Sequence, residues 1–263
     1  MGDHAVHTRS FASLCLAGLV SLTLGCVSVP AANQPKPAEA AEASRNVGID
    51  HVVNGRVALG IRDLRHAMTV YPDDALTNMW LGQAYLLKGR LDDSLVHAER
   101  AVELDPMSHE ARLNLSVINL HMGRYSEAVS HADLLVDDPT FASPWRALTN
   151  RGWGQLKQRQ LTLARRSLEE ALEYRPRYWP ALLNLGILEQ IEGDRLASLR
   201  YLEAVRELDP GSGAVAEANY RMAEAYVSLG HRERALHHLE EAIEASPHGR
   251  WGRQSREYLA LLR

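Results

Sequence analysis

The 263-residue sequence is poor in cysteine, in long apolar runs and in the motifs of known enzymes. It has two cysteines, a formal net charge of −4 and no run of five or more Lys or Arg. Nucleic-acid binding depends on neutralising phosphates, so this composition argues against it. No HExxH, P-loop, GxSxG or CxxC motif occurs. We therefore predict a protein that is not an enzyme and has no cofactor, metal site or small-molecule substrate.

The apolar run nearest the N-terminus is too short to span a membrane. Residues 11–24 are about fourteen in number, whereas a spanning helix needs ~20. The run ends in "SLTLGCVSVP", which contains Cys26. A short apolar run that leads through small residues to a cysteine is typical of an export signal. A secretory signal cut near Ala31 or Ala32 is the alternative.

The stretch around Cys26 resembles a bacterial lipoprotein signal, in which the cysteine is acylated and becomes the first mature residue. Cys15 lies inside the signal, so the exported chain keeps one thiol and no disulfide partner. The resemblance implies removal of residues 1–25 and lipidation of Cys26. No aspartate follows the cysteine, so the implied location is the periplasmic face of the outer membrane. Residues 26–40 are rich in proline and poor in large apolar residues, which predicts a flexible tether.

The remaining chain contains a repeat marked by proline and glycine. Proline follows similar tetrapeptide endings at residues 72, 106, 139, 176, 210 and 247, in steps of 34, 33, 37, 34 and 37. One set of small residues has the same spacing: Gly48, Gly82, Ser116, Gly152, Gly186 and Ala223. A second set lies seven residues later: Gly55, Gly89, Gly123, Arg159, Gly193 and Gly230, with arginine as the exception.

A period near 34 with Leu-Gly, an aromatic, a small residue and proline is the tetratricopeptide pattern. It predicts an all-α fold, a right-handed superhelical solenoid of paired helices. We expect six repeats within residues 41–249: 41–74, 75–108, 109–142, 145–178, 179–212 and 216–249. Residues 143–144 and 213–215 are expected to lengthen inter-repeat turns. Residues 250–263 are expected to form a C-terminal capping helix.

Three histidines, His231, His237 and His238, fall within eight residues near the C-terminus. Two imidazoles without a third ligand make a poor metal site. We interpret these histidines as solvated surface residues.

The resemblance to tetratricopeptide proteins implies that positions 2, 5, 6, 9 and 12 of each repeat face the concave groove. Position 6 is asparagine in four repeats: Asn46, Asn114, Asn150 and Asn184. Their amides can both donate and accept hydrogen bonds, which suits the backbone of an extended peptide. The alternative is that asparagine is simply frequent before Leu-Gly.

Positions 5, 9 and 12 are mostly apolar. They include Met79, Val117, Leu120, Trp153 and Ile187. Either these helices are unusually deeply buried, or the groove is apolar and binds a partner. We favour an apolar groove with Trp153 as its anchor. It lacks the Lys and Arg set that captures a C-terminal carboxylate in chaperone-binding relatives, which favours an apolar ligand.

A lipidated cysteine followed by six such repeats resembles the pilotin lipoproteins of type IV pili, the PilF and Tgl type. The phrases "SPWRALTNRGWGQLKQRQLTLARRSLEEAL", "ALLNLGILE", "EANYRMAEAY" and "WGRQSREYLALLR" are similar to that family. The resemblance implies an outer-membrane lipoprotein that binds the secretin subunit through an apolar segment and promotes its multimerisation. An outer-membrane-protein assembly subunit and an adaptor for peptidoglycan enzymes are the alternatives.

Overall fold

Residues 37–263, the range that the computed structural model describes, fold into thirteen α-helices and contain no strand. The predicted all-α fold is confirmed. The helices are α1 (Pro37–Val53), α2 (Val57–Met68), α3 (Ala75–Leu87), α4 (Leu91–Leu104), α5 (His109–His121), α6 (Tyr125–Val136), α7 (Pro144–Lys157), α8 (Leu161–Tyr174), α9 (Trp179–Glu192), α10 (Arg195–Glu207), α11 (Ser212–Ser228), α12 (Arg232–Ala245) and α13 (Arg250–Leu262).

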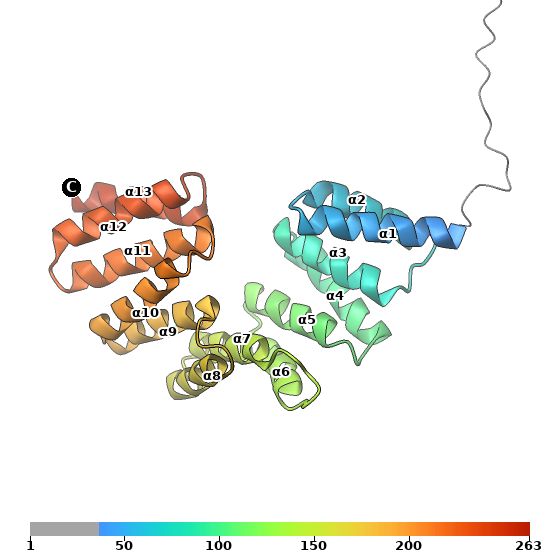
Figure 1. Ribbon diagram of the computed structural model, residues 1–263, viewed down its shortest axis with the longest axis horizontal. Helices are drawn as coiled ribbons and strands as arrows, with labels where there is room; N and C mark the ends of the chain where they lie inside the picture. Colours follow the sequence, from blue (N-terminus) through green and yellow to red (C-terminus); the bar gives the residue numbers. More distant parts are fainter. Residues whose placement is uncertain (1–36) are drawn as a thin grey trace, which may run out of the picture. The chain divides into compact units, whose positions relative to one another are not determined.

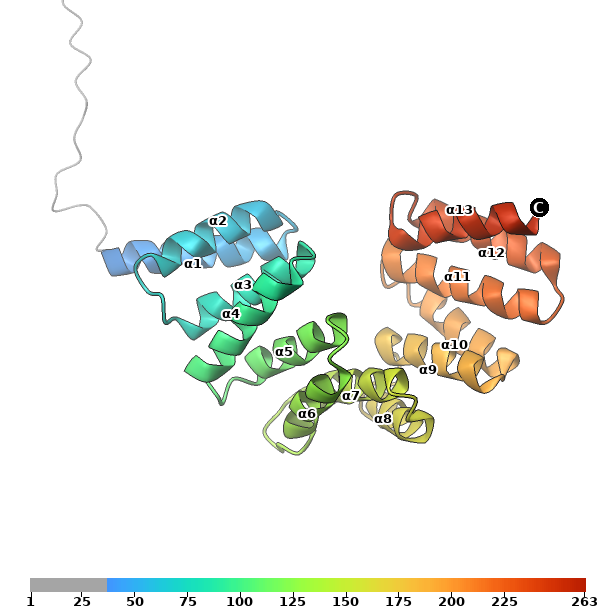
Figure 2. The same ribbon diagram turned by 180° about the vertical axis from the view of Figure 1, so that it is seen from behind.

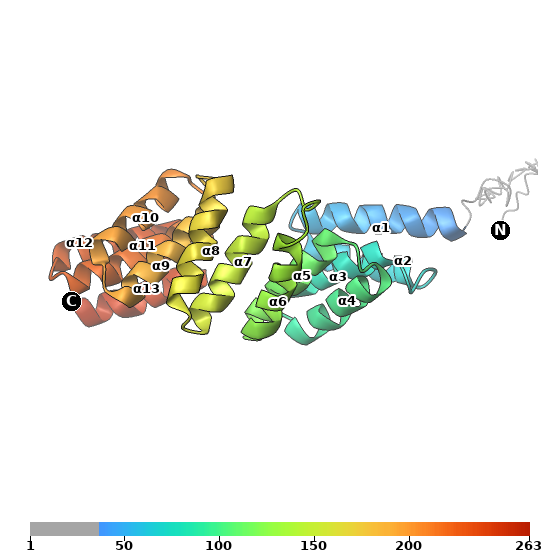
Figure 3. The same cartoon turned by 90° about the horizontal axis from the view of Figure 1, so that it is seen from below.

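The helices form successive pairs that stack as a solenoid. Each helix contacts the next one in the chain, and each odd-numbered helix also contacts the following odd-numbered helix. No two even-numbered helices contact each other within the described residues. The odd-numbered helices therefore form a continuous inner layer, with the even-numbered helices outside it (Figure 1). The same order is seen from behind in Figure 2, and Figure 3 shows α5 to α8 side by side.

The helix pairs match the six predicted repeats, and α13 matches the predicted cap, with differences at the starts of α1, α7 and α11. Helix α7 begins at Pro144, with Ser143 as its N-cap residue, so residues 143–144 start a helix and do not lengthen a turn. Helix α1 begins at Pro37, inside the predicted tether and before the predicted start of the repeats at residue 41. Proline's fixed φ suits the first turn of a helix, and Glu39 there is favourable to the helix dipole. Helix α11 begins at Ser212, so residues 213–215 lie in its first turn and do not lengthen a loop. Gly211, with φ +104°, makes the turn instead.

The first glycine of the repeat allows the two helices of a pair to approach closely. A Cβ atom at Gly152 would lie 2.7 Å from Leu168 Cγ, and one at Gly186 would lie 2.9 Å from Leu202 Cγ. Ser116 takes this place in the third repeat, where its hydroxyl donates a hydrogen bond to the Ala128 carbonyl at 2.9 Å. The small side chain at this position thus sets the distance between paired helices.

The second glycine of the repeat occupies the turn between paired helices. The five glycines in that turn have φ between +72° and +97°, the left-handed region that L side chains disfavour. Arg159, which replaces glycine in the fourth repeat, adopts φ +63°. The turn geometry is therefore kept even where the residue is unsuited to it.

The largest core cluster lies in the middle of the solenoid, between α7 and α11. Leu148, Leu185, Leu188 and Leu202 are fully buried there. Burying a leucine side chain contributes roughly 1.5–3 kcal/mol. The inner faces of α7 and α9 rest on this cluster, since Trp153, Leu183 and Ile187 pack in it or against it.

None of the helices within residues 37–263 is long and apolar enough to cross a bilayer. The predicted signal at residues 1–25, the lipidated Cys26 and most of the predicted tether lie outside the described residues.

Candidate partner-binding groove

A cavity of about 430 Å³ opens on the inner layer between α5, α7, α9 and α11. We call it the central groove. Its lining residues are Val117, Leu120, His121, Thr149, Asn150, Trp153, Trp179, Pro180, Leu183, Asn184, Ile187 and Glu217. On each of α5, α7 and α9 they recur at intervals of three or four, which places them on one face of the helix. The groove is therefore a product of helix periodicity in adjacent repeats.

Six of the nine residues predicted to bind a partner line this groove: Val117, Leu120, Asn150, Trp153, Asn184 and Ile187. The other three do not. Asn46 is exposed on α1, where its Oδ1 accepts a hydrogen bond from Arg45 Nε at 3.5 Å. Met79 on α3 and Asn114 on α5 are half-buried. The binding role of all nine stays a prediction.

Two asparagine amides face the groove in neighbouring repeats. Asn150 Nδ2 donates to Ser116 Oγ at 3.4 Å, a long and weak contact. No hydrogen bond joins the Asn184 side chain to another residue of the described range. Both amides are thus placed to pair with the backbone of a partner.

The floor of the groove is apolar and belongs to the core. Leu183 and Ile187 are each 7% exposed and pack in the core cluster beneath α9. Leu113, at the same repeat position as Leu183, is buried with Leu135 and Phe141. Deep burial, the alternative to an apolar groove, therefore accounts for part of the apolar pattern. Trp153 is only half-buried, and Lys157 Nζ lies 5.0 Å from its ring centre.

Glu217 is the acidic residue of the groove. Burial raises the pKa of its carboxyl group, while the nearby Arg221, Arg250 and Trp251 lower that pKa. Arg221 Nη2 lies 3.7 Å from Glu217 Oε1. This end of the groove is therefore occupied by an ion pair of the protein itself.

A second cavity of about 470 Å³ adjoins the central groove, sharing Trp153 and Ile187 with it. We call it the basic pocket. Its lining residues are Tyr125, Trp153, Leu156, Lys157, Arg159, Ile187, Gln190, Ile191 and Arg221. The sequence led us to expect a groove without a set of Lys and Arg. The lining of the central groove has none, but three basic residues from α7, the following turn and α11 meet at the adjoining basic pocket, which the sequence did not predict.

Several lining residues were not predicted. Pro180 and Glu217 occupy position 2 of their repeats and Thr149 occupies position 5, so the repeat pattern itself could have found them. Trp179 and His121 lie outside the groove-facing positions, and no sequence signal marks them. They line the cavity because they lie at the ends of α9 and α5.

The interpretation of His238 as a solvated surface residue is wrong. His238 is 7% exposed, its Nδ1 lies 3.0 Å from Asn219 Oδ1, and its ring stacks on Tyr226 at 5.2 Å. His231 and His237 are exposed. His238 joins the two helices of its pair, because it lies against Asn219 and Tyr226 of α11 and Glu241 of its own helix.

The same arrangement occurs in the second repeat. His97 Nδ1 lies 3.0 Å from Asn78 Oδ1, and its ring stacks on Tyr85 at 5.5 Å. We call these two sets, Asn78 with Tyr85 and His97, and Asn219 with Tyr226 and His238, the histidine staples. They hold helix pairs together and lie outside both cavities.

Stacked helix pairs with a continuous inner layer define a helical-repeat scaffold for protein interactions. Tetratricopeptide repeat models match residues 47–98, 92–142, 149–213 and 216–248. The chain belongs to the tetratricopeptide repeat family.

Two relatives match parts of the chain. Superkiller complex protein 3 of Mus musculus is 33% identical over 91 residues, which cover 34% of this chain and 6% of that protein. BBSome complex member BBS4 of Bos taurus is 24% identical over 237 residues, which cover 77% of this chain and 44% of that protein. The chain thus spans less than half the length of these relatives.

Among solved structures, PilW, titled a widely conserved type IV pilus biogenesis factor, has a TM-score of 0.68 at 18% identity. The match covers 81% of this chain and 97% of PilW. The pilF protein of Pseudomonas aeruginosa has a TM-score of 0.63 at 16% identity, with coverage of 84% and 99%. These likenesses show the fold that the chains share.

Proposed function

We propose that this chain is an outer-membrane lipoprotein of type IV pilus biogenesis that binds the secretin subunit and promotes its localisation and multimerisation. The observation that carries the proposal is the likeness to PilW and pilF over nearly the whole of those two chains. The lipoprotein-like sequence at Cys26 supports the membrane location. Its tether would keep the bound subunit at a high local concentration near its site of assembly.

The central groove supports an apolar partner. Its floor is formed by Leu183 and Ile187, and its half-buried Trp153 offers a large rigid surface. A tryptophan in the middle of an interface is a frequent hot spot. An apolar segment of an unassembled secretin subunit would aggregate if left uncovered, and this groove would cover it.

The test is a denaturant-resistant secretin multimer assay on membranes from wild-type and gene-deleted cells. We expect the multimer to be lost on deletion while the monomer remains. Trp153→Ala and Val117→Glu should each abolish the multimer in cells that still make the folded lipoprotein. Cys26→Ser should keep binding in a soluble pull-down but lose the membrane location.

Matched controls come from exposed residues outside the groove. Tyr174→Ala on α8 and Val96→Glu on α4 make the same kinds of change at side chains that are 59% and 64% exposed. Normal multimers are expected in both. Normal multimers in deleted cells would reject the proposal. In that case the proteins that co-purify with the chain would distinguish the assembly of outer-membrane proteins from peptidoglycan metabolism.

A further inference from the structure

The central groove and the basic pocket form one path along α7 and α9. The central groove begins at Trp179, the first residue of α9, and the basic pocket ends at Ile191 near its last turn. At ~1.5 Å per residue this path is about 18 Å long. An extended peptide of five or six residues, at ~3.3 Å each, has this length.

The two ends of the path differ in charge. Glu217 lies at the central groove, whereas Lys157, Arg159 and Arg221 line the basic pocket. Arg221 pairs with Glu217 and, at 3.1 Å, with Glu224. Within residues 37–263, neither Lys157 nor Arg159 has an ion-pair partner. The basic pocket therefore has two positive charges that no described carboxylate neutralises.

Arg159 of the basic pocket also lies in a strained turn. It adopts φ +63° at a turn position that is glycine in the other five repeats. The left-handed conformation costs a non-glycine residue roughly 1–2 kcal/mol. Strained residues of this kind cluster at ligand-binding sites. Glycine would adopt this turn with less strain than the arginine that occupies it.

Resting on the proposed function, we propose that the partner segment is an extended apolar stretch with one or more Asp or Glu side chains on one flank. The apolar stretch lies over Trp153 and Ile187 in the central groove, and the acidic flank pairs with Lys157 and Arg159. The Asn150 and Asn184 amides bind the backbone of the stretch. The charge difference along the path fixes the direction in which the segment lies.

A peptide selection tests this without assuming the partner. A library of random twelve-residue peptides with uncharged, blocked ends is selected for binding to the purified full-length chain. Peptides that bind wild type but not Trp153→Ala should contain a short apolar run with Asp or Glu on one side. Replacing those acids with Lys in synthetic copies should weaken binding about tenfold, the range expected for two exposed ion pairs. This difference should shrink in 1 M salt, because exposed charges are screened.

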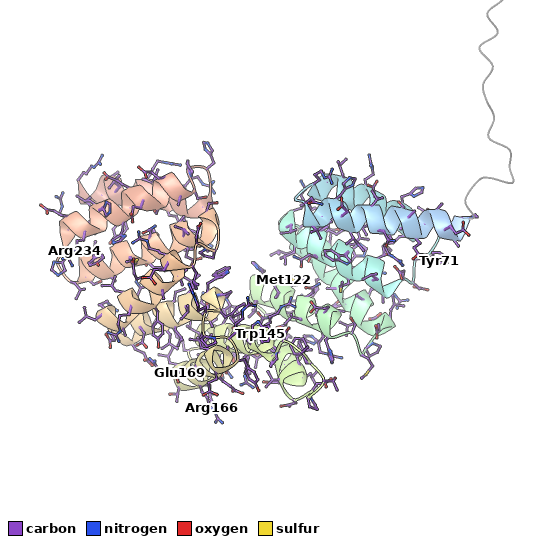
Figure 4. All side chains as sticks on the ribbon, in the orientation of Figure 1. Tyr71, Met122, Trp145, Arg166, Glu169 and Arg234 are labelled. Carbon is purple, nitrogen blue, oxygen red and sulfur yellow. The ribbon has the colours of Figure 1, made fainter. Side chains whose placement is uncertain are left out.

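The Lys157→Glu/Arg159→Glu double variant should reverse the preference, binding the Lys copies more tightly than the Asp or Glu originals. The matched control is Arg166→Glu/Arg177→Glu. Arg166 lies on the outer side of α8, away from α5 and α9 (Figure 4), and Arg177 is exposed. This control should bind as wild type does. Thermal melts check that all variants fold.

Three results would overturn the inference: no peptides that depend on Trp153, no acidic bias among such peptides, or a preference unchanged in the double variant. A parallel array of peptides from the secretin subunit separates the two proposals. If the selection gives acid-flanked peptides but no secretin peptide on the array binds, the secretin is rejected as the partner. The inference about the chemistry of the bound segment then stands.

Discussion

The paired helices of the fourth repeat are joined by different side chains from those of the second and sixth repeats. In the second and sixth repeats, the histidine staples occupy the junction. In the fourth repeat, Leu148, Gln155 and Ser167 take the places of the asparagine, the tyrosine and the histidine. Ser167 Oγ donates a hydrogen bond to Gln155 Oε1 at 2.8 Å. Arg151 Nε donates to Ser167 Oγ at 3.0 Å.

The difference follows the surroundings of each repeat. The middle repeats share a core cluster of fifteen buried residues that continues from α7 to α11. The second repeat contributes to two smaller clusters, one of five buried residues shared with the first repeat and one of four shared with the third. The sixth repeat has a cluster of three. The groove therefore lies on the part of the solenoid with the largest core cluster, which includes Ile187 and against which Trp153 packs. The outer repeats depend more on stacked aromatic and imidazole rings.

Truncation of a core leucine should have the largest effect on stability, and it tests whether the middle and outer repeats differ. Leu185→Ala in the middle cluster and Leu81→Ala in the N-terminal cluster both remove fully buried side chains. Each should lower the free energy of unfolding by about 2–5 kcal/mol. Only Leu185→Ala should also weaken binding of the selected peptides, since only Leu185 lies under the groove. Equal binding by the two variants would contradict the special support of the middle repeats.

A methyl group between paired helices should have the next largest effect. Gly152→Ala would bring a Cβ atom within 2.7 Å of the buried Leu168 side chain. The forced repacking should cost about 1–3 kcal/mol, measured by chemical denaturation. Gly213→Ala is the matched control, because it is helical and has no atom within 4 Å of the added Cβ. It should be neutral or stabilising by up to about 1 kcal/mol. Equal losses would show that close helix approach is not the cause.

Mild acid should weaken the outer repeats first. Burial lowers the pKa of His97; Arg65 lowers it further, and Asp93 raises it. Burial also lowers the pKa of His238; Arg206 and His237 lower it further, and Glu241 raises it. Below the unfolded pKa of about 6.5 the unfolded chain binds more protons, so stability is complete above that pH and falls as the pH decreases. Urea melts at pH 7 and pH 5 measure the loss.

The variant that removes this titration is His97→Gln/His238→Gln. Its stability should change less between pH 7 and pH 5 than that of wild type. His121 and the half-buried His131, whose pKa values burial also lowers, remain in it and should retain part of the slope. An identical pH dependence in both proteins would show that the histidine staples do not cause it.

The smallest effect should come from the strained turn. Arg159→Gly should raise the free energy of unfolding by about 1 kcal/mol or less, because relief of the left-handed strain is partly offset by glycine's greater freedom in the unfolded chain. It should also weaken the binding of the acid-flanked peptides to the chain. Gly123→Ala at the matching turn should be destabilising by a similar amount. A destabilising Arg159→Gly would indicate contacts of the arginine that outweigh its strain.

The repeat register and most helix ends could be predicted from the sequence because they depend on local backbone chemistry. Proline stops a helix, and a glycine at a tight turn or a close helix contact has no equal substitute. These constraints act within a few residues, so a 34-residue period reveals them. The start of α11 was missed because Gly211, and not residues 213–215, makes the turn.

Only the tertiary structure decided which predicted residues share a surface. Asn150 and Asn184 meet in one groove, whereas Asn46 and Asn114 at the same repeat position do not line it. The basic pocket joins Lys157 and Arg159 to Arg221 from two repeats further on, and His238 is buried by its own helix pair. The sequence by itself determined the repeats, through local limits on the backbone. The structure decided the groove, because its position depends on how neighbouring pairs pack, which is the sum of many side-chain contacts between residues distant in sequence.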